Sequence, residues 1–387
     1  MATSYWLKQR EIDHVVLERV QSGDSWRKRW DSFCLVSPNW TLNLPDFPYD
    51  GSDPDGFMPR DEIVDYVERY RAFVDPPMVN PVDVRSVRPL GQGWRLSTSD
   101  GEWDAGQVIV AGGSFQTPAV PDVASSIPGD VHQVTSDTYR NPQELPDGAV
   151  LVVGSGQSGC QIADDLHRAG RRVWLSMGGA TRVPRRYRGR DLFTWVLDIG
   201  LLEGPMSDHR EGPDARYAAN PQASGRDGGK DINLRECGRD GIKLVGRFVD
   251  ASGTEMRFAP DLIERLDAAD EACNQLIQGL EQYIANTGMD LPPDDREPVD
   301  WVPSDVPERV DLADENINTI IWCTGYKRDY SWIEGLEVDD HGYPITERGV
   351  TRSPGLYFVG LHGMHSPSSG LFWGGWLGRR ACRGTAQ

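Results

Sequence analysis

Cysteine is scarce in this chain and poorly placed for pairing. The 387 residues include six cysteines, at positions 34, 160, 237, 273, 323 and 382, and no two of them form a Cys-x-x-Cys motif. This spacing disfavours a disulfide scaffold, a zinc site and a dithiol reductase. Unpaired cysteines are typical of reducing compartments, so we expect a cytoplasmic location.

Long apolar runs and an excess of positive charge are also missing. No stretch approaches the ~18 apolar residues of a membrane-spanning helix, and the start shows no signal-peptide pattern. Lys and Arg number 40 against 59 Asp and Glu, which gives a formal net charge of −19. This charge disfavours nucleic acid and anionic membranes as partners. We therefore expect no nucleic acid and no membrane among the partners.

The segment AVLVVGSGQSGCQIADDLHRAGRRVWLS has the pattern of a dinucleotide-binding βαβ unit. An apolar strand over 149–153 precedes a glycine turn, a helix extends to about residue 169, and a second strand covers 172–175. The first glycine permits a tight turn, the second lets the backbone approach a pyrophosphate, and the third lets helix and strand pack closely. The turn consists of Gly154, Ser155, Gly156, Gln157, Ser158 and Gly159.

The residue that ends the second strand indicates which nicotinamide cofactor is bound. NAD sites usually have an acid there, but this chain has Ser176, followed by TRVPRRYRGRD. Guanidinium groups bind a 2′-phosphate that a carboxylate would repel. The sequence therefore predicts NADPH, with Ser176, Arg182, Arg185 and Arg186 as binding residues. The alternative is that these arginines form a solvated basic loop.

The N-terminus has the pattern of the second half of another such unit. SYWLKQREIDHVVLE predicts a helix from residue 3 and a strand over 14–18 that ends on Glu18. The strand and glycine turn that should precede this helix are absent, so we expect that the chain begins late within the unit. Glu18 is then the acid at the adenosine ribose of FAD. The alternative is an ordinary carboxylate at the end of a strand.

Several further motifs resemble the flavin-containing monooxygenase-like group, which includes Baeyer–Villiger-type enzymes. SGDSWRKRW is similar to a segment that lies along the flavin, VSPNW contains the asparagine of that family's motif, and VIVAGGSFQTPAVP and IIWCTGYK resemble its two small-residue triplets. The resemblance covers nearly the whole chain. It implies an FAD site that includes Glu18, Arg19, Trp26, Arg27, Trp30, Val84, Gly112, Thr324 and Gly325.

The resemblance has one departure near the expected chemistry. The family places a histidine between its two nucleotide units, but QVTSDTYRNP has Thr135 there, with Tyr139 retained and His132 three residues early. This departure puts strict coupling of NADPH use to oxygenation in doubt. After Gly370 the chain also ends without the amphipathic helix that usually covers the FAD site.

The fold class that follows is α/β, with two Rossmann-like domains. We expect a discontinuous FAD-binding domain over 1–146 and 308–387, whose first strand and glycine turn are missing. An NADPH-binding domain over 147–307 is inserted into it, with a helical insertion at about 192–307. Within that insertion, GRDGGKDINLRECGRDGIKLVGRF predicts short strands. A helix further along carries an apolar stripe of Leu262, Leu266, Ala269, Cys273, Ile277 and Leu280.

The resemblance implies an NADPH-dependent flavoprotein oxidoreductase, a monooxygenase that acts on a small organic substrate with O2 through a peroxyflavin. Asn39 and Thr135 are the expected catalytic positions. His362 and His365 are expected in a loop near the flavin, not as metal ligands, and no metal is expected. Two alternatives stay open: an NADPH oxidase or flavin reductase without oxygen insertion, and a non-enzymatic remnant that cannot hold FAD. A homodimer is left open.

Overall fold

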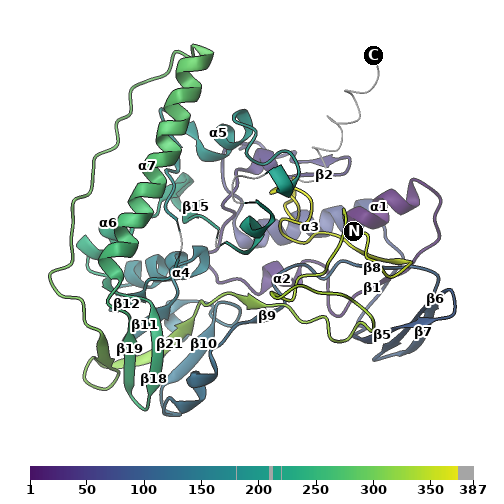
Figure 1. The fold of residues 1–387 in the computed structure, drawn as a ribbon, viewed down its shortest axis with the longest axis horizontal. Helices are drawn as coiled ribbons and strands as arrows, with labels where there is room; N and C mark the ends of the chain where they lie inside the picture. Colours follow the sequence, from purple (N-terminus) through teal and green to yellow (C-terminus); the bar gives the residue numbers. More distant parts are fainter. Residues whose placement is uncertain (180, 209–211, 219, 374–387) are drawn as a thin grey trace.

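A five-stranded parallel sheet forms the centre of one of two lobes in the computed structural model, which describes residues 1–179, 181–208, 212–218 and 220–373 (Figure 1). We call this part the sheet lobe. The strand order is β10, β21, β11, β12, β17, and every pair is parallel. These strands are β10 (His132–Thr135), β21 (Ile317–Trp322), β11 (Ala149–Val153), β12 (Val173–Ser176) and β17 (Lys243–Val245).

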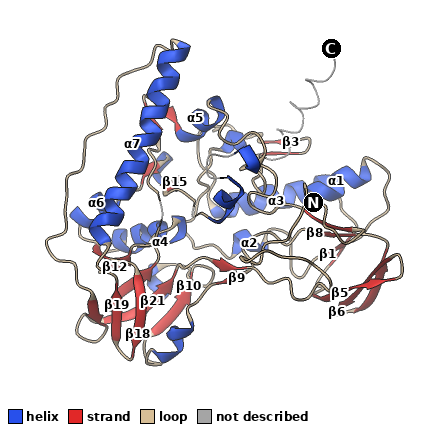
Figure 2. Ribbon diagram, in the orientation of Figure 1, coloured by secondary structure: helices blue, strands red, loops and turns tan. Residues whose placement is uncertain are grey.

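Both faces of this sheet are covered, which explains why β11 reads as a continuous apolar run. Val150 and Val152 pack in one core cluster and Leu151 and Val153 in another, because successive side chains point to opposite faces. Helices α4 (Gln157–Arg168), α6 (Leu234–Arg239) and the first half of α7 (Leu262–Thr287) contribute to the first cluster. The antiparallel strands β18 (Phe248–Ser252), β19 (Glu255–Phe258) and β20 (Arg309–Asp311) contribute to the second (Figure 2).

The predicted helix of the insertion is confirmed as α7. The helix buries Leu262, Leu266, Ala269, Cys273 and Leu280 of the predicted stripe. The short strands predicted before it need one correction, because β17 joins the central sheet beside β12. A lone strand forms more backbone hydrogen bonds at the edge of an existing sheet than it would without a partner strand in the insertion. The remaining elements here are α5 (Leu192–Asp198), the pair β13 (Arg186–Tyr187) and β14 (Arg190–Asp191), and the pair β15 (Ala223–Ser224) and β16 (Lys230–Asp231).

The second lobe contains the N-terminal residues and the end of the described chain (Figure 1). The predicted helix and strand near the N-terminus are confirmed as α1 (Ala2–Lys8) and β1 (Val16–Leu17). Two parallel pairs lie here, β1 with β4 (Met78–Val79) and β8 (Val108–Val110) with β23 (Leu356–Phe358). The other elements are α2 (Asp24–Arg27), α3 (Arg60–Val74), the hairpin β2 (Asn43–Leu44) and β3 (Phe47–Pro48), and the sheet β5 (Val84–Leu90), β6 (Gly93–Thr98) and β7 (Gly101–Ala105).

Two chain crossings connect the lobes and pair with each other. β9 (Thr117–Pro118) pairs antiparallel with β22 (Tyr326–Lys327). The central sheet also takes β10 and β21 from outside the range 147–307. The predicted domain limits therefore stay a prediction, and the strand pairing favours wider limits for the inserted domain. The predicted irregular end after Gly370 lies largely outside the described residues. None of the helices in the described part of the chain is long and apolar enough to cross a membrane.

A buried carboxylate on α4 joins the two lobes. Asp165 is 6% exposed. Its Oδ2 accepts a hydrogen bond from the Tyr139 hydroxyl at 2.7 Å, and its Oδ1 accepts one from the Ser32 hydroxyl at 2.6 Å. The guanidinium of Arg226 lies 3.0 Å from the same Oδ1. One side chain thus holds the segment after Trp30, the segment after β10 and the insertion in place.

Asp165→Asn should destabilise the protein by about 1.5–3 kcal/mol, the scale of hydrogen bonds to a charged group. The neighbouring Asp164, with 29% side-chain exposure and an ion pair to Arg168, is a matched control. Asp164→Asn should cost no more than about 1 kcal/mol, as expected for an exposed pair. Urea unfolding measures both. Equal losses in the two variants would contradict the role given to Asp165.

Gly159 sets the distance between α4 and β11. A Cβ on this residue would lie 1.8 Å from the Gly154 carbonyl oxygen and 3.3 Å from the Cys323 Cβ. The helix can therefore approach the strand this closely only with glycine here, which agrees with the role predicted for the third glycine of the turn. Gly279, on the exposed side of α7, has no atom within 4 Å of its hypothetical Cβ.

Gly159→Ala should cost about 1–3 kcal/mol, the usual cost of overpacking, because α4 must move away from β11. Gly279→Ala should instead be neutral or stabilise the protein by up to ~1 kcal/mol, since alanine favours the helix. Chemical denaturation followed by far-UV circular dichroism gives both values. A tolerated Gly159→Ala would show that the helix has room to shift.

Candidate functional site

The carboxyl edge of the central sheet gathers most of the predicted nucleotide-binding residues. β11 lies between β12 and β21, and the chain leaves β11 toward α4 and β12. The backbone N–H of Cys323 donates to the Val153 oxygen at 2.8 Å, so the two strands end side by side. Ligands of open α/β sheets bind outside the carboxyl ends of the strands where the winding direction changes. The expected ligand position is therefore outside the ends of β11 and β21, beside Gly154 and Cys323.

The glycine turn has the geometry that a dinucleotide requires. Gly154 has a φ of +104°, and a Cβ there would lie 2.4 Å from the Cys323 carbonyl oxygen. Gly156 caps α4, and no atom of the described residues beyond its chain neighbours lies within 4 Å of its hypothetical Cβ. The backbone is thus open to a ligand at the N-terminus of a 12-residue helix, where amide groups and the helix dipole favour a phosphate. The residues present fit a pyrophosphate.

The polar residues of the turn are held by the chain itself. Ser155 is fully buried, and its hydroxyl accepts a hydrogen bond from the Gly178 N–H at 3.0 Å. Its carbonyl accepts one from Gln222 Nε2 at 2.7 Å. Gln157 and Ser158 are both partly exposed on the first turn of α4. Gln222 was not predicted, because no sequence pattern connects a residue of the insertion with the glycine turn.

Ser176 and Arg185 do not have the free polar groups that the sequence predicted. Ser176 is 1% exposed, and its hydroxyl bonds to the Gly246 carbonyl and the Phe248 N–H. Arg185 is also 1% exposed. Its guanidinium lies 2.6 Å from the Asp191 carboxylate, and burial lowers its pKa. A direct role for either side chain in binding a 2′-phosphate is not supported by this geometry.

The other arginines of this segment hold neighbouring elements. Arg186 donates to the carbonyls of Gly228 and Gly229. The ion pairs are Arg182–Asp270 at 3.0 Å and Arg188–Glu281 at 2.8 Å, both to α7, and Arg190–Asp198 at 2.6 Å, to α5. Most of these arginines therefore form ion pairs or hydrogen bonds that attach the loop to neighbouring parts of the chain. Neither reading made from the sequence anticipated this arrangement.

The predicted FAD residues lie mainly in the second lobe, near strand ends. Glu18 follows β1 and accepts a hydrogen bond from the Val20 N–H at 3.3 Å, Arg19 is exposed, and Val84 begins β5. In the part of the chain that the structure describes, Gly112 and Gly325 have no atom within 4 Å of their hypothetical Cβ atoms apart from their chain neighbours. Their backbones are thus open to a ligand. The Thr324 hydroxyl donates to the Ala119 carbonyl at 2.6 Å and so holds the start of the β9–β22 ribbon.

The aromatic segment after Gly23 is largely packed. Trp26 stacks on Phe372, with ring centroids 5.5 Å apart. Arg27 forms an ion pair with Glu68 at 2.9 Å. Trp30 is 2% exposed and belongs to the core of the sheet lobe. A packing role explains Trp30 better than the predicted contact with a flavin.

Asn39 is buried, at 4% exposure, and its amide is already engaged. Its Oδ1 accepts a hydrogen bond from the Met58 N–H at 2.8 Å, and its Nδ2 donates to the Asp53 carbonyl at 2.9 Å. These bonds close the loop between β3 and α3. The structure therefore gives Asn39 a loop-holding role, and its predicted catalytic role stays a prediction.

Thr135 ends β10 at the same edge of the sheet as the glycine turn. It pairs with Trp322, directly before Cys323, and its hydroxyl accepts a 3.3 Å hydrogen bond from the Asp137 N–H. His132 begins the same strand and pairs with Thr319, at the opposite edge. Three residues of strand separate the two positions by about 10 Å. His132 therefore cannot replace the missing histidine.

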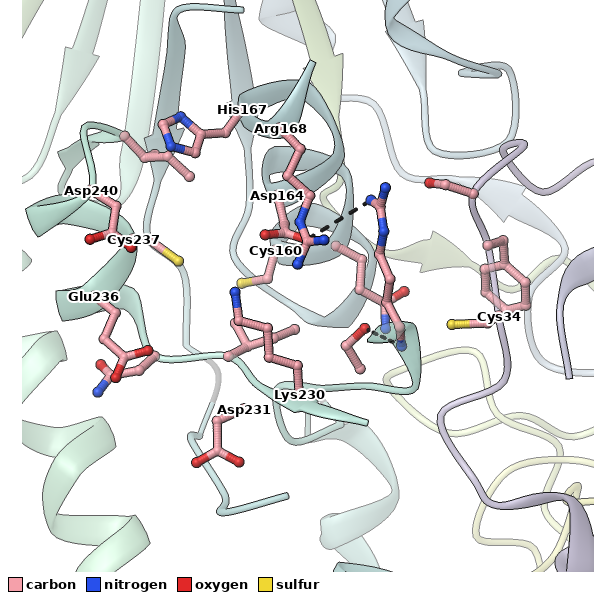
Figure 3. Close-up of a pocket in the computed structure, with 18 of the residues that line it drawn as sticks. Cys34, Cys160, Asp164, His167, Arg168, Lys230, Asp231, Glu236, Cys237 and Asp240 are labelled. Carbon is pink, nitrogen blue, oxygen red and sulfur yellow. Dashed lines mark hydrogen bonds and ion pairs between the residues drawn. The ribbon is translucent and has the colours of Figure 1, made fainter. Parts of the chain in front are cut away.

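Behind Asp165 lies a cavity of about 180 Å³ between α4, the 224–242 segment and residues 30–34. In Figure 3 the sulfur atoms of Cys160 and Cys237 point into the space between α4 and α6, and Cys34 stands apart. Burial raises the pKa of Cys34 to about 11 and that of Cys237 to about 12, and it also raises the pKa of Cys160. Such thiols are poor nucleophiles at neutral pH, which disfavours thiol redox chemistry in the cavity.

Metal ligation finds no support in the described ranges, in which no cluster of three or more His, Cys, Asp or Glu side chains could hold an ion. His362 lies in the loop after β23, where its N–H donates to the Ser114 hydroxyl at 2.8 Å. Burial and the charge of Arg328 lower the pKa of its imidazole. In the same loop the His365 carbonyl accepts a hydrogen bond from Met206.

Comparison of the sequence with known proteins finds related oxidoreductases. Residues 1–190 match the family described as pyridine nucleotide-disulphide oxidoreductase. A CzcO-like oxidoreductase of Geobacillus kaustophilus is 31% identical over 97% of this chain and 91% of its own length. A probable indole-3-pyruvate monooxygenase of Arabidopsis thaliana is 27% identical over 52% of this chain and 50% of its own length.

A solved structure has the same fold. The flavin-containing monooxygenase of Stenotrophomonas maltophilia superposes with a TM-score of 0.63 and 18% identity, covering 99% of this chain and 94% of that one. The match in fold extends over both lobes, and the sequence match to the Geobacillus protein extends over nearly the whole chain. The chain therefore belongs to the CzcO-like oxidoreductases, and its fold is that of a flavin-containing monooxygenase.

Proposed function

We propose that this enzyme uses NADPH to reduce a bound FAD and then oxygenates a small organic substrate with O2. The observation that carries the proposal is the open glycine turn at the carboxyl edge of the sheet. There the backbone of Gly156 is open, and the neighbouring Gly154 lies against Cys323, which leads into the ribbon between the lobes. A nicotinamide cofactor held by the turn would reach toward the second lobe.

The second lobe offers the features that FAD would need. Gly112 and Gly325 leave backbone open for a large planar ligand, and Glu18 stands at the end of β1, where an acid binds a ribose. FAD supplies the electron acceptor for the hydride of NADPH and the electrons for O2. The chain contributes binding, orientation and exclusion of water. The loop that contains His362 and His365 would cover part of this region.

Two observations bear on the alternatives. Thiol–disulfide chemistry, which the family description includes, is disfavoured by the raised pKa values of the buried cysteines in the described residues. An NADPH oxidase without oxygen insertion is favoured by Thr135, because threonine cannot carry a charge and offers a single hydroxyl. The ratio of peroxide to oxygenated product separates this candidate from the monooxygenase.

Purified protein supplied with excess FAD should show a flavin absorbance band, and NADPH should bleach this band under anaerobic conditions. NADH should act roughly tenfold more slowly or worse, because it lacks the phosphate that would form charge-assisted hydrogen bonds. Stopped-flow absorbance gives both rates. A protein that retains no flavin would instead support the reading as a non-enzymatic remnant, and equal rates would contradict the choice of NADPH.

Thr135→His should shift NADPH consumption away from hydrogen peroxide and toward oxygenated product. A histidine at the end of β10 can hold two polar partners and can carry charge near neutral pH, so it would retain the oxidised nicotinamide more firmly. Peroxide and product are measured per NADPH consumed, with candidate substrates containing a soft heteroatom or a carbonyl. His132→Ala, at the far end of the strand, serves as the control and should leave the ratio unchanged. Tight coupling in the wild type would refute the argument.

A further inference from the structure

NADPH differs from NADH by a 2′-phosphate on its adenosine ribose, and this ribose is expected next to the end of β12. In a dinucleotide-binding unit the residue after the second strand reads the ribose 2′ position. Here Met177 to Gly179 follow Ser176, and the Gly178 N–H is tied to Ser155 in the glycine turn. The nearest atom to a hypothetical Cβ on Gly178 is 4.0 Å away. The space above these glycines is therefore open.

The first side-chain atom across that space belongs to an arginine of α7. Arg265 Nη1 lies 3.9 Å from the hypothetical Cβ of Gly179. Its Nε and Nη2 both bond to Asp261 Oδ2, at 2.8 and 2.7 Å. Asp261 thus holds the Nε and Nη2 side of the guanidinium in place and leaves Nη1, which lies near Gly179, able to donate to another group. A guanidinium N–H held in this way can form a charge-assisted hydrogen bond to a phosphate.

A second arginine is held by the same carboxylate. The backbone N–H of Arg247 donates to Asp261 Oδ1 at 2.9 Å, directly after β17 and Gly246. Its side chain is exposed and has no ion pair with the described residues. Hydrogen bonds from the Arg265 side chain and the Arg247 backbone, together with the charges of both arginines, lower the pKa of Asp261 despite its burial. The carboxylate therefore stays charged and continues to orient both residues.

Arg182 completes the group from the loop after β12. Its Nη2 pairs with Asp270, one turn and a half beyond Arg265 on α7. Its Nε is buried and lacks a hydrogen-bond partner among the described residues. The N-terminal end of α7 adds a partial positive charge beside these guanidinium groups. In a chain with a net charge of −19, three guanidinium groups thus stand near the carboxylates of Asp261 and Asp270, and that of Arg247 has no ion pair with the described residues.

We propose that Arg265 and Arg247, together with Arg182, bind the 2′-phosphate of NADPH and determine the preference of the enzyme for NADPH over NADH. The proposal rests on the proposed use of NADPH and deepens it. It moves the specificity from Arg185 and Arg186, which the sequence predicted, to α7 and the end of β17. The insertion would then supply the residues that distinguish the two cofactors.

Binding of 2′,5′-ADP and 5′-AMP to the FAD-supplemented protein tests this assignment by calorimetry, because these probes differ at the 2′-phosphate and need no flavin chemistry. Arg265→Ala and Arg247→Ala should each weaken binding of 2′,5′-ADP by roughly tenfold to a hundredfold, the scale of charge-assisted hydrogen bonds. Binding of 5′-AMP should not change. Arg265→Lys should recover part of the loss, because it keeps the charge without the fork.

Arg309→Ala, which removes an exposed arginine of β20, is the control and should leave both probes unaffected. The NADPH-to-NADH ratio of kcat/KM should fall in parallel with the affinity for 2′,5′-ADP. If the affinity for 2′,5′-ADP is unchanged in both alanine variants, or both probes weaken equally, the assignment is overturned while NADPH use stands. A wild type that binds 2′,5′-ADP no more tightly than 5′-AMP would overturn the preference itself.

Discussion

The contact on which the arrangement most depends is the buried carboxylate of Asp165. It lies on the helix that carries the glycine turn, and it binds the hydroxyls of Ser32 and Tyr139 and the guanidinium of Arg226. These three partners come from the second lobe, from the connection after β10, and from the insertion. A charge buried this deeply is tolerated only when its oxygens are well satisfied. The position of α4, and with it the glycine turn, is therefore coupled to three separate parts of the chain.

The glycine turn and the helices could be predicted from the sequence because their causes are local. A tight turn at Gly154 and the apolar stripe of α7 depend on residues a few positions apart, and both are found where the pattern placed them. The roles of the arginines could not be predicted in this way. Whether a guanidinium meets a ligand or a carboxylate of its own chain depends on where α7 packs. Arg185 therefore pairs with a carboxylate of its own chain. Arg265, some 80 residues later, lies beside Gly179, where we propose that the 2′-phosphate binds.

The same reasoning applies to the sheet and to the buried polar side chains. The pairing of β11 with β21 joins residues more than 160 positions apart, and no local pattern encodes that neighbour. Asn39 and Trp30 match family motifs by type and spacing, but their exposure is decided by the loops and core around them. Motif matching selected the segments of the candidate site, and their role in binding stays a prediction. It could not state which side chains in them are free.

The pairing of β9 with β22 has a mechanical consequence for the space between the lobes. Two separate single-chain linkers would let the lobes slide and swivel independently. Hydrogen bonds between the linkers join them into one two-stranded ribbon, which is stiffer than two separate segments. Together with the contacts of Asp165, this pairing restricts how far one lobe can move relative to the other. Two ligands held on opposite sides of that ribbon would therefore meet in a repeatable arrangement.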